Sequence, residues 1–293
     1  MTSKSHLFIG TYTDGDSEGI YVYSLDHTTG KLQLTSVTTD IKNPSYIEIH
    51  PSQELLYAVS ELSDGGGLIS SYAIDPLTGS LNYINQQTTG DEGPCHLSIN
   101  TSGDVVAVAN YSGGSITTLP IDSDGSLGQP TGFIKHHGSS INTHRQEGPH
   151  PHSANIDPFN KNLLVPDLGL DKVMVYPINT ETGTLTELTP SWAETTPGAG
   201  PRHLAFHTNH NLVYVINELD STITAFKYDS EIGSLEEFQN VSTLPNTYSG
   251  DNYCADIHIS PNGKFLYGSN RGHDSIAIYA ISQDSGQLEY IEH

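Results

Sequence analysis

Short apolar runs separated by polar turns fill the chain, and the same order of runs returns about every fifty residues. Each copy has a first apolar run, a short polar turn, a second apolar run, a third run that alternates apolar and polar residues, and a weaker fourth run. The last copy shows this third run over residues 276–281. Alternation with a period of two indicates β-strands, because successive side chains of a strand point to opposite faces. The pattern therefore predicts four short strands per copy.

Signals for helices are nearly absent from the chain. No segment keeps a helical period, whereas Tyr, Thr, Val and Ile gather in short runs between Gly, Asn, Asp and Pro. Four short strands in a repeat of this length are typical of β-propeller blades. We therefore expect an all-β fold, with a single β-propeller domain over residues 1–293 made of about six four-stranded blades.

Superposing the copies assigns side chains to two equivalent positions. The innermost strand of a blade should start on the side where the second strand ends, so these two chain positions should share one rim of the propeller. The first position holds Ser45, Cys95, His152, Arg202 and Ala255. The second position holds Glu61, Tyr111, Leu168, Glu218 and Arg271. The titratable and charged members that we expect to meet at one channel mouth are His152, Arg202, Glu218 and Arg271.

Charge narrows the range of partners. The formal net charge is -23, from 34 acidic and 11 basic residues, which disfavours nucleic acid and anionic membranes as partners. Only three arginines are present: two occupy rim positions, and the third, Arg145, precedes His152 in a His-rich loop. A guanidinium group keeps its charge and matches phosphate or carboxylate in shape. We therefore expect an anionic ligand.

The first residues of the chain and its two cysteines bear on the cellular compartment of the protein. Residues 1–6 are polar and lead directly into an apolar strand, without an apolar signal segment or a stretch long enough to cross a bilayer. The two cysteines, Cys95 and Cys254, do not make a disulfide framework. Cys95 falls at a rim position, but a cysteine on an innermost strand is more commonly a packing residue than a nucleophile. We expect a cytoplasmic protein and favour a monomer.

The His-rich loop over residues 136–152 is the longest departure from the repeat. Imidazole groups suit zinc or nickel, so a metal site is one interpretation of this loop. Insertions in propellers form rim loops that carry specificity, which favours a wall or lid over the channel mouth. We adopt the second interpretation and expect neither a metal nor a cofactor.

Five long motifs, in order, closely resemble the seven-bladed propeller lactonases, and the resemblance covers essentially the whole chain. The motifs are Pro151-His-Ser-Ala-Asn-Ile156, Gly198-Ala-Gly-Pro-Arg-His-Leu-Ala-Phe-His207, Ile216-Asn-Glu-Leu-Asp-Ser-Thr222, Ala255-Asp-Ile-His-Ile-Ser-Pro-Asn-Gly263 and Ser269-Asn-Arg-Gly-His-Asp-Ser275. The resemblance implies a carboxylic ester hydrolase that acts on a small anionic sugar lactone. The implied reaction converts 6-phospho-D-glucono-1,5-lactone to 6-phosphogluconate in the oxidative pentose phosphate pathway of glucose metabolism.

The resemblance also implies roles for individual residues. The catalytic residues proposed in lactonizing members of the family match His152, Arg202, Glu218 and Arg271, the four residues that the superposition brings together. A carboxylate or an imidazole would activate water, and the arginines would hold the lactone carbonyl or the phosphate. Either Glu218 or His152 could be the general base. The further residues that we expect to bind substrate are Arg145, His150, His203, Asn217 and Glu61.

One departure from the family and two other function classes remain open. The chain shows about six copies of the second and third strands but only five innermost strands, so we expect the last of the seven blades to be missing and its strand edges to be bare. The protein could instead be a lactonase or cycloisomerase for an unphosphorylated sugar or muconate-type lactone, because a fold does not determine a function. It could also be a non-enzymatic propeller that binds protein partners on its rim.

Overall fold

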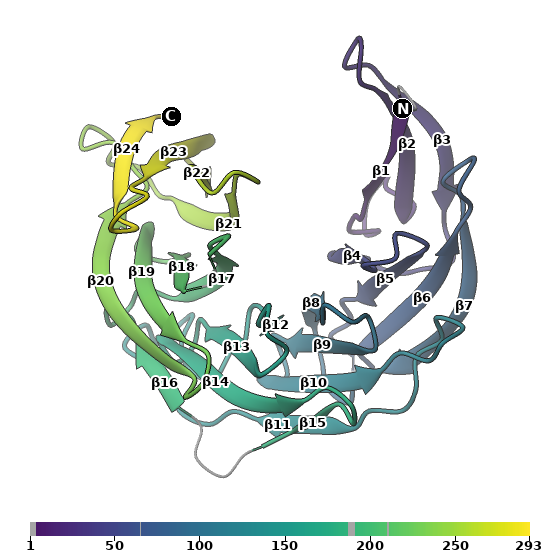
Figure 1. Ribbon diagram of the computed structural model, residues 1–293, viewed down its shortest axis with the longest axis horizontal. Helices are drawn as coiled ribbons and strands as arrows, with labels where there is room; N and C mark the ends of the chain where they lie inside the picture. Colours follow the sequence, from purple (N-terminus) through teal and green to yellow (C-terminus); the bar gives the residue numbers. More distant parts are fainter. Residues whose placement is uncertain (1–3, 65, 187–190, 210) are drawn as a thin grey trace. The chain divides into compact units, whose positions relative to one another are not determined.

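The computed structural model describes residues 4–64, 66–186, 191–209 and 211–293. These residues form β-strands and turns, and no helix occurs among them (Figure 1). The expected all-β class is therefore confirmed. The chain divides into two compact units, one comprising Met1–Phe133 and Thr180–Thr184 and the other comprising Ile134–Asn179 and Leu185–His293. The expectation of a single domain over residues 1–293 stays a prediction.

Three sheets are built on the first unit, and in each sheet every strand pairs with the next strand along the chain. The first sheet contains β1 (Lys4–Ile9), β2 (Ile20–Asp26) and β3 (Leu32–Thr38). The second contains β4 (Ile47–Ile49), β5 (Leu55–Ser60), β6 (Leu68–Ile74) and β7 (Leu81–Thr88). The third contains β8 (Pro94–Ile99), β9 (Val105–Asn110), β10 (Ser115–Pro120) and β11 (Gly132–Lys135).

Three more sheets are built on the second unit. The first contains β12 (Asn155–Ile156), β13 (Asn162–Asp167), β14 (Lys172–Asn179) and β15 (Thr184–Leu185), with β16 (Ser191–Glu194) paired to β14. The second contains β17 (Pro201–Phe206), β18 (Leu212–Asn217), β19 (Thr222–Asp229) and β20 (Ser234–Ser242). The third contains β21 (Tyr253–Ile259), β22 (Phe265–Arg271), β23 (Ser275–Ile281) and β24 (Leu288–Glu292).

This order confirms the predicted repeat of four strands. The predicted innermost strands are β4, β8, β12, β17 and β21, and each of them pairs with the second strand of its own sheet. The sheet β1–β3 begins with the equivalent of a second strand, as the sequence pattern predicts. The residues that open the innermost strands and close the second strands are neighbours, because Pro201 pairs with Asn217 and Tyr253 pairs with Arg271.

Equivalent residues tie successive sheets together within each unit. In the first unit the imidazole Nε2 of His50 lies 2.7 Å from the carbonyl oxygen of Gly103, and in the second unit Nε2 of His207 lies 2.9 Å from that of Gly263. Two tyrosines repeat a second contact of this kind, from Tyr57 to Gly125 and from Tyr214 to Gly286. These histidines and tyrosines are therefore structural, and they explain why similar residues return at similar places in the sequence.

The core of the second unit holds its three sheets in contact. Val213 and Val215 of β18 pack against the sheet of β13 and β14, while Tyr214 and Ile216 pack against the sheet of β21–β24. A strand covered on both faces is apolar throughout, which is why β18 shows no alternation. Each fully buried aliphatic or aromatic side chain contributes about 1.5–3 kcal/mol relative to exposure. This packing fixes the ends of the three sheets, where the candidate site lies.

Candidate functional site

All three arginines of the sequence contact one carboxylate, that of Glu218, at the end of β18. Arg145 Nη2 lies 2.6 Å from Glu218 Oε1. Arg202 Nε and Arg271 Nη2 each lie 3.0 Å from Glu218 Oε2. The Glu218 side chain is only 5% exposed. A buried carboxylate therefore collects three guanidinium groups from three separate segments of the chain.

The backbone before β17 holds Glu218 in place. The Glu218 N–H donates to the carbonyl oxygen of Gly200 over 2.7 Å, and the Leu219 N–H donates to that of Ala199 over 2.9 Å. Gly200 has a φ of +64°, and an added Cβ there would lie 2.6 Å from Leu219 Cγ. Only glycine adopts this conformation without strain and leaves the room that Leu219 requires. The Gly200 turn thus brings Arg202 and Glu218 to the same rim.

Arg202 is the most firmly held of the three arginines. Its Nη1 donates to the carbonyl oxygen of Ala255 over 2.7 Å and lies 3.2 Å from Nε2 of His203, while its Nε binds Glu218. The side chain is 15% exposed. Its Nη2 makes no hydrogen bond to any residue that the structure describes. This nitrogen is therefore available to an incoming anion.

Arg271 is also held by the backbone of β21. Its Nε and Nη2 donate to the carbonyl oxygens of Tyr253 and Cys254 over 3.3 Å and 3.0 Å, in addition to the contact of Nη2 with Glu218. Half of the side chain is exposed, and within the described residues Nη1 has no hydrogen-bond partner. A second guanidinium nitrogen therefore remains open beside Arg202.

Arg145 reaches the site from the His-rich loop. Its guanidinium carbon lies 5.8 Å from the centre of the Tyr253 ring, within the range of a cation–π contact, and its Nη2 binds Glu218. This contact supports the interpretation of the loop as a wall of the site. Three guanidinium groups around one carboxylate leave a net positive charge, in a chain whose formal charge is -23. Such a local field attracts an anionic ligand.

Two histidines lie beside the arginines. His152 Nε2 is 3.8 Å from Glu218 Oε2, and the His152 side chain is 13% exposed. The ring of His152 meets the ring of His203 edge to face, with centres 5.4 Å apart. His152 is thus the imidazole that lies both next to the Glu218 carboxylate and at the margin of the arginine cluster.

His203 connects Arg202 to a further carboxylate, Asp256. His203 Nδ1 lies 2.8 Å from Asp256 Oδ1, and His258 Nε2 lies 2.8 Å from Asp256 Oδ2. Burial lowers the pKa of His203, although the hydrogen bond to Asp256 opposes this shift. Burial alone would raise the pKa of Asp256, but its hydrogen bonds with His203 and His258 outweigh that effect and hold the pKa below its usual range. A neutral His203 then donates from Nδ1 to Asp256 and accepts from Arg202 at Nε2.

The structure brings together the four side chains that superposition of the repeats assigns to one rim, and it adds Arg145 to them. Of the other predicted binding residues, His203 contacts Arg202, and His150 lies on the same loop as Arg145, with its ring 3.2 Å from the Glu147 carboxylate. The roles assigned to these residues stay predictions.

Two further predicted binding residues, Asn217 and Glu61, make their contacts elsewhere in their own units. The Asn217 side chain is fully buried and donates to the hydroxyls of Thr222 and Thr224, because it precedes Glu218 and points to the opposite face of β18. Glu61 belongs to the first unit, where its carboxylate accepts a hydrogen bond from the Tyr12 hydroxyl over 2.8 Å. We therefore do not include either residue in the candidate site.

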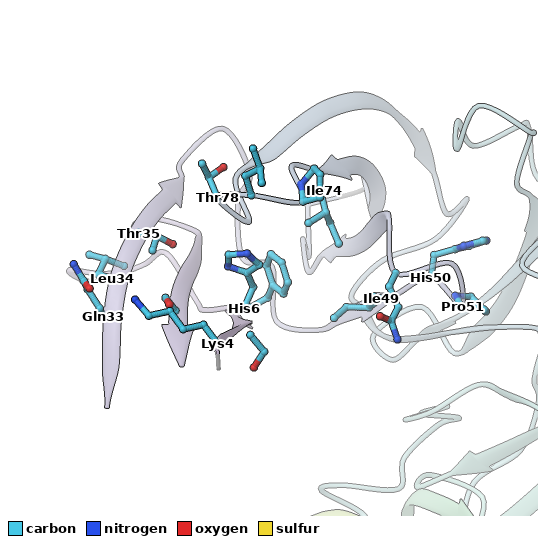
Figure 2. A pocket seen from close by; sticks show the side chains of 16 residues that line it. Lys4, His6, Gln33, Leu34, Thr35, Ile49, His50, Pro51, Ile74 and Thr78 are labelled. Carbon is cyan, nitrogen blue, oxygen red and sulfur yellow. The ribbon is translucent and has the colours of Figure 1, made fainter. Parts of the chain in front are cut away.

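A large cavity of the first unit offers no comparable chemistry. It has a volume of about 1190 Å³ and lies between the sheets β1–β3 and β4–β7, and its lining includes Lys4, His6, Ile49 and Ile74 (Figure 2). No Asp or Glu is among the described residues that line it. The ring nitrogens of His50 in its wall are already bonded to the Ser52 hydroxyl and the Gly103 carbonyl. We therefore place the candidate site at Glu218.

Other candidate chemistry is limited in the part of the chain that the structure describes. No group of three or more His, Cys, Asp or Glu side chains there could hold a metal ion. His136 of the His-rich loop is instead buried against Asp167, with Nδ1 2.6 Å from Oδ2. Cys95 and Cys254 are not joined in a disulfide. Among the described residues, no helix is long and apolar enough to cross a membrane.

Comparison with known proteins identifies the family. The family described as Lactonase, 7-bladed beta-propeller matches residues 6–293. A 6-phosphogluconolactonase of Bacillus subtilis (strain 168) is 37% identical over 286 residues, which cover 97% of this chain and 80% of the relative. A 6-phosphogluconolactonase of Formosa agariphila is 35% identical over 293 residues, which cover 98% and 82%. The structure of the periplasmic gluconolactonase of Pseudomonas aeruginosa is 34% identical with a TM-score of 0.92, covering 99% of this chain and 82% of that chain.

The repeated four-stranded sheets and these relatives define a β-propeller enzyme of the hydrolase class. More specifically, the chain belongs to the lactonase family of seven-bladed β-propellers. The β-propeller fold class and the lactonase type of enzyme that the sequence predicts are thereby confirmed.

Proposed function

We propose that this protein hydrolyses 6-phospho-D-glucono-1,5-lactone to 6-phosphogluconate at the site around Glu218. The observation that carries the proposal is the convergence of all three arginines on one buried carboxylate, which gathers positive charge at one place in an acidic protein. Two curated relatives are named 6-phosphogluconolactonase, which supports this choice of substrate. With this substrate the reaction belongs to the oxidative pentose phosphate pathway, and the cytoplasm remains the expected compartment.

Glu218 is better suited to organising the arginines than to accepting a proton. Its Oε1 accepts from Arg145, its Oε2 accepts from Arg202, and Arg271 forms an ion pair with Oε2. Both oxygens of this carboxylate thus already face charged donors, which suits an anchoring role. His152, at 3.8 Å from Glu218 Oε2, lies at the edge of this cluster. We therefore assign the general base to His152 and the anchoring of the guanidinium groups to Glu218.

The proposed reaction needs no group beyond these side chains and water. His152 takes a proton from water as the water oxygen attacks the lactone carbonyl, and the carbonyl oxygen becomes the oxyanion of a tetrahedral intermediate. When the intermediate collapses, the bond from the carbonyl carbon to the ring oxygen breaks. The proton held by His152 then passes to the ring oxygen, which becomes the hydroxyl of the product acid.

The open guanidinium nitrogens stabilise the negative charges of substrate and intermediate. Arg202 Nη2 is the more buried of the two donors and suits the oxyanion, because electrostatic stabilisation is largest where water is excluded. Arg271, which is half-exposed, and Arg145, which is 36% exposed, lie nearer to solvent and suit a phosphate group. This division explains why three arginines, rather than one, are gathered at the rim.

A second candidate is hydrolysis of an unphosphorylated gluconolactone. The similarity to the periplasmic gluconolactonase of Pseudomonas aeruginosa favours this alternative. The same His152 and Arg202 could serve both reactions, whereas the outer arginines would then lack a phosphate to bind.

The test is the initial rate of hydrolysis of freshly prepared 6-phosphogluconolactone, with the spontaneous rate subtracted and gluconolactone measured in parallel. The proposal predicts a clear enzymatic rate that is much faster for the phosphorylated lactone. Equal or faster hydrolysis of gluconolactone would favour the second candidate. Absence of an enzymatic rate with both lactones would contradict both.

A further inference from the structure

Asp171 is a buried carboxylate that the proposed mechanism does not use. It lies in the turn between β13 and β14, has a φ of +53° and is 5% exposed. Its Oδ1 accepts from Gln146 Nε2 over 2.7 Å and from the Gly200 N–H over 2.8 Å. Its Oδ2 accepts from the Ser140 hydroxyl over 2.5 Å and from the Gly198 N–H over 2.6 Å. One carboxylate thus satisfies four donors.

The four donors belong to the two segments that carry Arg145 and Arg202. Ser140 and Gln146 lie on the His-rich loop, where Gln146 directly follows Arg145. Gly198 and Gly200 form the turn that leads into β17, two residues before Arg202. Asp171 therefore joins the backbone that presents Arg145 to the backbone that presents Arg202. Ile141 of the loop also lies next to Gly198, but the Asp171 carboxylate is hydrogen-bonded to both segments at once.

The joint requires an ionised carboxylate. All four partners are donors, and an ionised carboxylate is the side chain that offers only acceptor sites on two oxygens. An asparagine would place an NH2 group against two of the four donors and leave them unsatisfied in a buried position. The free-energy cost of leaving a buried donor without an acceptor is larger than the net stability that a typical hydrogen bond contributes. An Asp to Asn change therefore disrupts the joint while changing the side chain volume little.

Ser221 and Asp274 occupy the same turn position in the other two sheets of the second unit, with φ values of +58° and +51°. The Ser221 hydroxyl accepts from Asn252 Nδ2 over 2.9 Å, and Asp274 Oδ1 accepts from the Gly272 N–H over 3.1 Å. Neither of these side chains joins two segments that carry arginines. The positive φ is thus a property of the repeat, whereas the four-donor carboxylate is particular to position 171.

We propose that Asp171 is a positioning residue for the lactonase reaction, acting by fixing Arg145 and Arg202 so that both guanidinium groups meet on Glu218. This proposal rests on the proposed function for its effect on turnover, but the joint itself can be measured without substrate. Asp171 touches neither the reacting atoms nor the bound anion in this account. Its influence passes through the two arginine segments.

The test compares Asp171→Asn with Asp157→Asn as a matched control. Asp157 is a fully buried carboxylate at the opposite end of the same sheet, where it accepts from the Tyr228 hydroxyl over 2.6 Å and from the Lys161 N–H over 2.8 Å. Both changes remove a buried charge from one sheet, so both should lower the melting temperature. Only Asp171→Asn should lower kcat, by about 100-fold, the loss that accompanies a misplaced oxyanion donor.

Hydrogen–deuterium exchange of the intact protein tests the joint without turnover. In Asp171→Asn, peptides covering residues 140–146 and 198–202 should both exchange about tenfold faster, because hydrogen bonds to a charged group are lost there. In Asp157→Asn these two peptides should keep the wild-type rates. Unchanged exchange in both peptides of Asp171→Asn would overturn the proposal, as would equal kcat losses in the two variants. A wild-type protein without lactonase activity would instead refute the proposed function, whatever the exchange result.

A double-mutant cycle distinguishes positioning from a general loss of stability. If Asp171 acts through Arg145 and Arg202, the kcat loss caused by Asp171→Asn should be smaller in an Arg145→Ala background than in the wild type. Fully additive losses in kcat would show that Asp171 does not act through Arg145, and would contradict the proposal.

Discussion

Replacement of Glu218 by Gln tests the division of roles between Glu218 and His152. Gln keeps the shape of the side chain but removes the charge that three guanidinium groups share. The Arg145 and Arg271 side chains are 36% and 52% exposed, so water screens their attraction to Glu218. Each of these two ion pairs therefore contributes about 0–1 kcal/mol to stability. Arg202 is 15% exposed and keeps its contacts with Ala255 and His203. Removing one partner of a buried pair costs about 3–5 kcal/mol, and these retained contacts reduce that cost.

The expected loss of stability in Glu218→Gln is therefore about 2–3 kcal/mol, most of it from the Arg202 pair. Turnover should fall by about 100-fold, since the arginines lose their common anchor and the oxyanion donor is misplaced. The pH dependence of kcat on the acidic side should remain, because His152 still accepts the proton. In His152→Gln the activity should be low and this acidic dependence should be absent.

The assay measures kcat for lactone hydrolysis from about pH 5 to about pH 8, the range in which His groups change charge, after subtraction of the spontaneous rate. Denaturant unfolding of each variant gives the stability term separately. The reverse result, in which Glu218→Gln loses the acidic dependence and His152→Gln retains it, would refute this division of roles. That outcome would make Glu218 the general base.

Three further predictions concern single residues. Arg202→Ala should lower kcat by about 100-fold to 1000-fold in steady-state assays. Arg202→Lys should restore little, because a compact ammonium group lacks the planar fork with which Arg202 reaches Glu218, the Ala255 carbonyl and the oxyanion from three separate nitrogens. Burial lowers the pKa of His203, so below about pH 6.5 the His203 side chain takes up a proton in the unfolded chain before it does so in the folded protein. The melting temperature should therefore fall as the pH falls below this value, and it should fall less steeply in His203→Gln. Burial raises the pKa of Cys254 to about 11, so a thiol reagent should not modify Cys254 in the folded protein, as mass spectrometry would show.

The sequence predicts the fold well because the repeat is local. Each strand carries its own apolar pattern. The innermost strand pairs with the second strand in the same way in each blade, so the repeat itself predicts which residues are neighbours. That is why Arg202, near the start of an innermost strand, and Arg271, at the end of a second strand, come to the same rim. Successive side chains of a strand point in opposite directions, which explains why Asn217 is not part of the cluster. It lies next to Glu218 in sequence, but its side chain donates to the Thr222 hydroxyl of the neighbouring strand.

The contacts made by loops are not predictable in the same way. The His-rich loop has no sister copy to superpose, so its alignment of Arg145 with Glu218 and Tyr253 depends on tertiary contacts alone. Asp171 resembles an ordinary turn residue in the sequence, because the positive φ is shared with Ser221. Its four partners come from two distant segments, and only the folded chain brings them together.

The crystal structure of the protein with bound 6-phosphogluconate tests the location of the site most directly. The account predicts that the carboxylate or phosphate oxygens lie within about 3 Å of Arg202 Nη2 and Arg271 Nη1, with the sugar acid next to His152. Binding of 6-phosphogluconate in the cavity between β1–β3 and β4–β7, with the arginines around Glu218 left without a ligand, would contradict it.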